Sequence, residues 1–136
     1  MPTPYLSQNF PLPIPVLPIT LGAMEERPWL GPFKALLDSG ADLTIVPLLL
    51  LQRIKAHPVG AGRLRSLWGD AHPFAFYMVE MQIEDLLLPG VRVAGDSMVR
   101  EIILGRNVLN KLPLFLDGPE QQTTLLNDLT TKRLRA

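Results

Sequence analysis

Short apolar runs, separated at close spacing by turn residues, limit the folds open to this chain more than any other feature. Only two short segments, 48–55 and 108–111, are predicted as helix, the first opened by Pro47 and the second capped by Asn107. Many short strands with few helices are typical of an all-β barrel or sandwich. The predicted strands are 15–22, 33–37, 43–46, 74–83, 91–94, 100–104, 114–116 and 123–126.

Proline and glycine mark the segments between these strands. Six of the 14 prolines lie in the first 18 residues, so this region is predicted to be extended, along a sheet edge or at a subunit contact. Residues 56–62 are predicted as a loop, Trp68–Pro73 as a turn between two strands, and Pro89–Gly90 as a further turn.

One acidic residue stands out because it directly follows an apolar run. In the segment Ala35–Asp42, Leu36 and Leu37 predict the end of a buried strand, and Asp38 enters a turn made by Ser39 and Gly40. A carboxylate in this position is costly unless something holds or uses it. Loops supported by a rigid sheet often carry catalytic groups, so Asp38 is a candidate catalytic residue.

Composition excludes several other functions. The chain has 136 residues, 47% of them hydrophobic, which suffices for one domain with a real core. It carries no net charge and no basic stripe beyond the tail Lys132–Arg135, so nucleic-acid binding is not expected. Without cysteine there is neither a disulfide framework nor thiolate chemistry, and His57 and His72 lie too far apart for metal-ligand spacing.

We expect no membrane span, because no apolar run approaches 18 residues. No leader sequence is recognisable, which makes a cytoplasmic protein the expectation.

Two motifs in order resemble those of one protein family. Ala35–Asp42 resembles the active-site loop of aspartic proteases, and Ile102–Leu109 resembles the second signature of retropepsin-like (retroviral-type) proteases. In that family the arginine of the second motif pairs with the aspartate four residues past the catalytic one; here these are Arg106 and Asp42.

The resemblance covers residues 14–128, leaving 1–13 as a proline-rich arm and 129–136 as a tail. It is closest to single-domain cellular or bacterial members of the family. It implies a closed acid-protease-type barrel with a flap hairpin and one short C-terminal helix.

Aspartic-protease chemistry needs two carboxylates, one as base and one protonated, that share a proton. This chain has only one apolar-Asp-Ser-Gly motif, so the dyad would form across a two-fold axis between Asp38 of two identical subunits. The resemblance implies that Ser39 hydrogen-bonds across this axis, that Gly40 leaves space for substrate, and that Arg106 holds Asp42 in a buried bidentate pair. An ordinary surface pair is the alternative.

Ala41 and Asn107 complete the expected support of the site. Because family members build a shared interface sheet from their termini, residues 123–126 are the candidate for that sheet; the alternative is an edge strand of one subunit.

Residues Leu64–Phe76 occupy the position of the flap. Its tip would be Trp68, Gly69 and Asp70, with Leu67, Leu43 and Val46 lining the substrate groove; an ordinary hairpin is the alternative. Two departures from the family are Ser39, where threonine is commoner, and a flap without a glycine-rich tip. Phe10–Pro11 resembles the aromatic-proline sites that such enzymes cut, so self-cleavage there is a hypothesis beside a chance match.

The sequence therefore predicts a homodimeric aspartic endopeptidase that cleaves extended, apolar peptides without a cofactor or metal. One alternative is a non-catalytic dimeric peptide-binding module on the same fold, because fold does not guarantee chemistry. Another is an enzyme of this fold acting on a different amide or ester.

Overall fold

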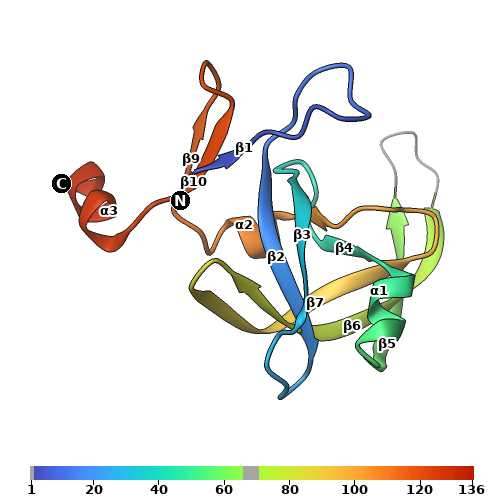
Figure 1. Ribbon diagram of the computed structural model, residues 1–136. Coiled ribbons are helices and arrows are strands. Elements are labelled where there is room, and N and C mark those ends of the chain that lie inside the picture. Colours follow the sequence, from blue (N-terminus) through green and yellow to red (C-terminus); the bar gives the residue numbers. More distant parts are fainter. Residues whose placement is uncertain (1, 66–70) are drawn as a thin grey trace.

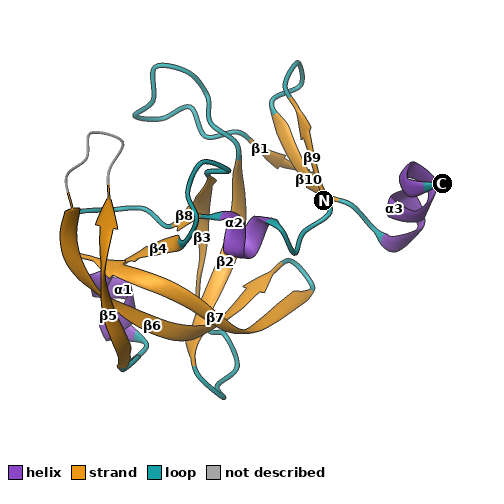
Figure 2. Ribbon diagram, turned by 180° about the vertical axis from the view of Figure 1, so that it is seen from behind, coloured by secondary structure: helices purple, strands orange, loops and turns teal. Residues whose placement is uncertain are grey.

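The computed structural model describes residues 2–65 and 71–136 (Figure 1). Strands dominate, and each of the three helices is eight residues long or shorter (Figure 2). In chain order the elements are β1 (Thr3–Pro4), β2 (Val16–Ala23), β3 (Leu30–Leu37), β4 (Thr44–Pro47), α1 (Leu48–Arg53), β5 (Pro58–Arg65), β6 (Ala71–Ile83), β7 (Leu86–Asp96), β8 (Ile103–Leu104), α2 (Arg106–Leu109), β9 (Leu114–Asp117), β10 (Gln122–Leu125) and α3 (Asp128–Arg135).

Six strands form a closed barrel in the order β2-β3-β8-β4-β7-β6, and pairing of β2 with β6 completes the circle. The closing register sets Ile19 opposite Ile83 and Leu21 opposite Met81. β5 adds to β6 outside this ring. Closure leaves no free edge within the ring. The prediction of an all-β, closed acid-protease-type barrel is confirmed.

The core of the barrel follows the two-residue period of its strands. On β2 the fully buried Leu17, Ile19 and Leu21 alternate with the partly exposed Pro18 and Thr20. Their partners in the core come from β6 and β7, whose buried residues include Val79, Met81, Ile83, Val91 and Val93.

A second, three-stranded sheet lies outside the barrel, in the order β1-β10-β9 (Figure 1). Thr3 lies opposite Thr123, so the proline-rich arm pairs with β10 of its own chain. Residues 123–126 were predicted as a shared interface strand or an edge strand. Because β10 has a neighbour on each side, both of its edges are occupied within the chain.

The C-terminal residues expected as a tail form α3 instead. Asn127 caps this helix by accepting a hydrogen bond from Thr130 N–H at 2.8 Å, and none of its residues is buried. Across the part of the chain that the structure describes, no helix is both long and apolar enough to cross a membrane.

Two loop predictions were wrong. Most of the predicted loop 56–62 belongs to β5, an edge strand that pairs only with β6; proline and glycine are tolerated at such an edge. Gly62 also leaves room for the Phe76 ring, which a Cβ would approach to 2.7 Å.

Pro89–Gly90 lies inside β7, beside a register shift on β6 between Val79 and Met81. Gly90 takes φ +61° there and donates its N–H to Glu80 Oε1 at 3.1 Å. These two residues make a bulge within a continuous strand, and the chain reverses earlier, between β6 and β7.

Candidate active site

The Asp38 loop connects β3 to β4 and is anchored on β8, which lies between them. Leu36 and Leu37 pair in parallel with Ile103 and Leu104. Asp38 N–H continues this ladder by donating to the Leu104 carbonyl at 3.0 Å. Asp38 is therefore fixed at the end of a paired strand, as the apolar run before it predicts.

The Asp38 carboxylate is held by its own loop and remains open to solvent. Its Oδ1 accepts a hydrogen bond from Gly40 N–H at 2.9 Å, and the backbone carbonyl of Asp38 accepts one from Ala41 N–H at 3.1 Å. Ser39 and Gly40 are exposed and Ala41 is half-buried. This turn orients one carboxylate oxygen while leaving the group accessible to water or substrate.

Arg106 connects the two ends of the loop. One guanidinium nitrogen, Nη2, forms an ion pair with Asp42 Oδ1, and the other, Nη1, donates to the Ser39 carbonyl at 2.9 Å. Arg106 N–H also donates to the Ala41 carbonyl at 2.8 Å. The predicted pairing of Arg106 with Asp42 is present in the structure.

The expected burial of this pair is wrong for the single chain, because the two side chains are 45% and 86% exposed. The pair is also not bidentate, since the guanidinium divides its nitrogens between Asp42 and Ser39. Exposed pairs contribute up to about 1 kcal/mol to stability, so this pair is expected to add little to the stability of the fold.

A buried polar network lies behind the loop. Thr44 has no exposed surface, and both its N–H and its hydroxyl donate to Asn107 Oδ1, at 2.9 and 2.8 Å. The same hydroxyl accepts from Gly105 N–H at 3.0 Å, and Asn107 Nδ2 donates to the Arg92 carbonyl at 2.8 Å. These bonds join β4, α2 and β7.

Sequence reasoning missed Thr44 and gave Asn107 the wrong role. Gly105, not Asn107, precedes α2 as its N-cap, and Asn107 lies inside the helix. The available signal was that Thr44 is the one hydroxyl residue within the apolar run Leu43–Val46, and a buried hydroxyl needs a partner.

Gly105 permits the close approach of the two motifs. A Cβ at this position would lie 2.6 Å from the carbonyl carbon and 2.9 Å from the nitrogen of Leu43. Any other residue would push the Asp38 loop away from α2.

The structure describes only some of the residues predicted to contact substrate. Leu43 is half-buried, whereas Val46 is fully buried in the core and does not line a groove. The predicted flap tip, Trp68, Gly69 and Asp70, and the predicted groove residue Leu67 lie outside the described residues. The two strands of this hairpin are described, and their pairing extends to Arg65 opposite Ala71.

A cavity of about 490 Å³ lies beside this hairpin. Its lining is mainly apolar and includes Leu48, Phe74, Tyr77 and Met98. A larger cavity, of about 700 Å³, lies between α3 and the turn joining β6 to β7. Asp38 lines neither of these two cavities.

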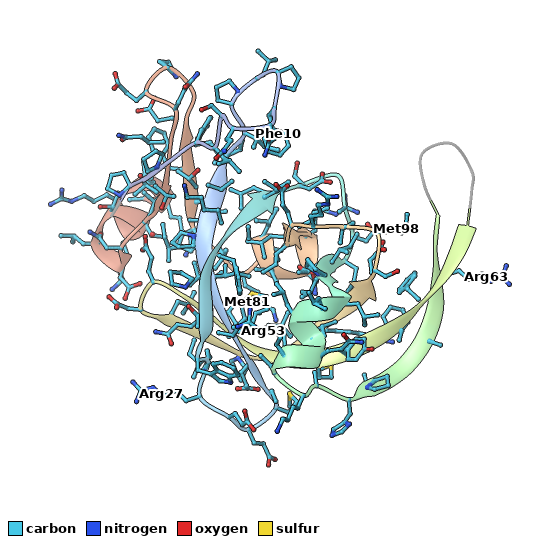
Figure 3. The ribbon with its side chains drawn as sticks, turned by 45° about the vertical axis from the view of Figure 1, so that its right-hand side comes forward. Phe10, Arg27, Arg53, Arg63, Met81 and Met98 are labelled. Atoms are coloured by element: carbon cyan, nitrogen blue, oxygen red, sulfur yellow. The ribbon has the colours of Figure 1, made fainter. Side chains whose placement is uncertain are left out.

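The Phe10–Pro11 bond lies in a closed loop above the barrel (Figure 3). An antiparallel bridge between Leu6 and Ile14 closes the loop, and Phe10 N–H donates to the Ser7 carbonyl at 3.4 Å. Phe10 is half-buried. This segment is turned, not extended.

Within residues 2–65 and 71–136, no group of three or more His, Asp or Glu side chains is placed to hold a metal ion. Within the two motifs, Ala35–Asp42 and Ile102–Leu109, the ionisable residues are Asp38, Asp42 and Arg106.

Comparison with known proteins identifies the fold. No protein-family model matches the sequence, and no characterised protein matches it in a sequence search. Among solved structures, the EIAV protease in complex with the inhibitor HBY-793 matches with a TM-score of 0.59 and 18% identity, over 78% of this chain and 93% of that one.

Two further solved structures match the fold of this chain. The retroviral protease-like domain of Ddi1 from Leishmania major has a TM-score of 0.57 and 17% identity, covering 84% of this chain and 89% of that one. The foamy viral protease-reverse transcriptase bound to an RNA/DNA hybrid has a TM-score of 0.54 and 15% identity, over 90% of this chain and 14% of that one. The chain thus has the retropepsin-like fold.

Proposed function

We propose that this chain, a domain of retropepsin-like fold, is an aspartic endopeptidase that acts as a homodimer. The observation that carries the proposal is the Asp38 loop. Its carboxylate is solvent-accessible at the end of a paired strand, and Arg106 bridges Ser39 and Asp42 behind it. A module that only binds peptides has no need for this combination of an open carboxylate and a braced loop.

In the proposed dimer Asp38 meets its counterpart from the second copy. Two carboxyl groups about 3 Å apart share one proton, because both cannot ionise cheaply. The ionised member takes a proton from water, whose oxygen attacks the peptide carbonyl carbon, while the protonated member donates to the carbonyl oxygen. The tetrahedral intermediate then breaks its C–N bond as the amine nitrogen takes a proton from the dyad. One hydroxyl of the intermediate returns its proton to the dyad, which leaves the carboxylic acid product and the singly protonated dyad.

The neighbours of Asp38 have separate roles in this proposal. The exposed Ser39 hydroxyl hydrogen-bonds across the two-fold axis, and Gly40 leaves the space above the loop free for substrate. The substrate binds as an extended chain along the β5–β6 hairpin, with an apolar side chain in the cavity beside Phe74 and Tyr77.

The test is cleavage of a peptide library at acidic and neutral pH by the wild type, Asp38→Asn and Asp85→Asn. Asp38→Asn keeps the shape of the side chain but cannot act as base, so we expect cleavage to be abolished. Asp85 is an exposed carboxylate in the turn between β6 and β7, so its variant should cleave as the wild type does.

Subunit mixing tests the shared dyad. If subunits exchange freely, adding an equal amount of Asp38→Asn should reduce wild-type activity to about half, because half of the wild-type chains then sit in mixed dimers. Undiminished cleavage by Asp38→Asn would reject the mechanism. Tight peptide binding without cleavage by the wild type would instead identify the non-catalytic module.

A further inference from the structure

Backbone pairing does not tie the outer half of the β5–β6 hairpin to the barrel. Among the described strands, β5 pairs with β6 alone. β6 in turn pairs with β7 no further than Ala75, which lies opposite Gly95. Beyond that point the described part of the hairpin stands out from the barrel (Figure 3). Its position therefore depends on side-chain contacts close to Ala75.

One such contact joins Phe76 on β6 to Arg92 on β7. The register sets Phe76 opposite Ala94, and Arg92 lies two residues further along β7, on the same face of the sheet. Arg92 Cζ lies 4.2 Å from the centroid of the Phe76 ring. A guanidinium at this distance is attracted to the negative face of an aromatic ring. Because Arg92 is exposed, its side chain can be replaced without opening the core.

The Phe76 ring also packs against both strands of the hairpin. On β5, an added Cβ would approach the ring to 2.7 Å at Gly62 and to 3.6 Å at Gly60. On β6, Phe74 packs edge-to-face against it, with the two ring centroids 5.0 Å apart. The Cβ position at Gly60 is also 4.0 Å from Arg92 Nη2. The guanidinium of a barrel strand therefore reaches across β6 to the edge strand β5.

The backbone of Arg92 belongs to the network behind the Asp38 loop. Its carbonyl accepts the hydrogen bond from Asn107 Nδ2 at 2.8 Å, while Asn107 Oδ1 accepts from Thr44. The Asn107 N–H donates to the Asp42 carbonyl at 3.2 Å. Arg92 thus contacts both the support of the Asp38 loop and the hairpin.

We propose that Arg92 is a positioning residue, whose guanidinium, stacked on Phe76, holds the β5–β6 hairpin at a set position relative to the Asp38 loop. The effect on cleavage rests on the proposed function, because only a substrate bound by both parts senses their relative position. The hold on the hairpin itself is independent of that function and can be measured without substrate.

The contact should act on binding more than on chemistry. A hairpin that is held less firmly has to be ordered by the peptide, which weakens binding of the peptide in its ground and transition states alike. Such a loss raises KM and leaves kcat nearly unchanged. A contact of this kind at an exposed site corresponds to about a two- to fivefold change in affinity.

Peptide cleavage kinetics of Arg92→Met test this effect, because methionine keeps much of the length but lacks the charge. We expect KM to rise about two- to fivefold and kcat to change by less than about twofold. Arg92→Lys keeps a cation within reach of the ring, so its KM should lie between those of Arg92→Met and the wild type. Arg27→Met is the matched control: Arg27 is exposed in the turn between β2 and β3, and its variant should keep the wild-type KM (Figure 3).

A Phe76→Leu background separates the contact from a general structural effect. Without the ring, Arg92→Met should no longer raise KM, because the contact is already lost. The same increase in both backgrounds, or an Arg92→Lys variant no better than Arg92→Met, would overturn the proposal.

Hydrogen exchange of residues 58–63 measures the hold on the hairpin directly. Local opening is easier where fewer contacts resist it, so these β5 amides should exchange about two- to fivefold faster in Arg92→Met than in the wild type or Arg27→Met.

The two proposals fail separately. An active wild type whose Arg92→Met variant keeps both the wild-type KM and the wild-type exchange would reject the role of Arg92 and keep the protease. An inactive wild type whose β5 exchange rises in Arg92→Met would reject the protease and keep the hold of Arg92 on the hairpin.

Discussion

Replacing Thr44 by valine tests whether the buried network behind the Asp38 loop stabilises the fold. Valine has nearly the shape of threonine but no hydroxyl. The change removes one bond donated to Asn107 Oδ1 at 2.8 Å and one accepted from Gly105 N–H at 3.0 Å. Thr44 and Gly105 are buried, whereas Asn107 is half-buried, so water is excluded from the bond to Gly105 but not from Asn107.

The two lost bonds differ in cost. Gly105 N–H is left buried without an acceptor, which costs about 1–3 kcal/mol. Asn107 Oδ1 keeps the bond from Thr44 N–H at 2.9 Å, so losing the bond from the Thr44 hydroxyl costs about 1 kcal/mol. We therefore expect Thr44→Val to lower the free energy of unfolding by about 2–4 kcal/mol.

Thr44→Ser is the matched control, because it keeps the hydroxyl and loses only a methyl group. Its expected cost is about 1 kcal/mol. Urea unfolding of all three proteins at one chain concentration measures the difference, since the proposed dimerisation would make stability depend on concentration. A valine variant as stable as the wild type, or more stable than the serine variant, would refute the role of the network.

Three further expectations follow from the site. Gly105→Ala should destabilise the fold by about 3 kcal/mol, because the added Cβ would lie 2.6 Å from the Leu43 backbone. If the variant unfolds at the same urea concentration as the wild type, the Leu43 backbone can move to accommodate the methyl group. Asp42→Asn should change the unfolding free energy by less than about 1 kcal/mol yet slow cleavage, because Arg106 loses its charged partner; equal rates would show that the pair does not hold the loop. A free peptide spanning residues 7–13 should be cut at Phe10–Pro11 faster than the intact chain, whose loop must first open. Mass spectrometry of wild type beside Asp38→Asn measures this, and an uncut peptide with equal masses would end the self-cleavage hypothesis.

The barrel and the Asp38 loop could be predicted because their signals are local. The two-residue alternation along β2 and β6 predicts which side chains enter the core. The Asp38 turn depends only on consecutive residues. Edge strand β5 and the Pro89–Gly90 bulge were missed for the opposite reason. Proline and glycine mark turns in most sequences, and only the pairing partner shows that here they lie in strands.

The buried network could not be predicted because it depends on pairs distant in sequence. Thr44 and Asn107 are 63 residues apart, and Thr44 and Gly105 are 61 apart. Asn107 follows a glycine at a helix start, which locally favours a capping role. The fold overrides that preference because the side chain of Asn107 can satisfy the buried Thr44 and the Arg92 carbonyl at once.

The same reasoning explains why the sequence did not reveal which strands flank residues 123–126. Residues 123–126 combine β-branched and apolar residues, which predicts a strand but not its neighbours. In the structure the arm residue Thr3 pairs with Thr123 on one side of β10, and β9 occupies the other side. Because the chain's own arm fills one edge of β10, β9 rather than β10 has an open edge in this sheet. Which strand stays at the edge thus depends on where the N-terminal arm pairs, a choice that no single segment of the sequence encodes.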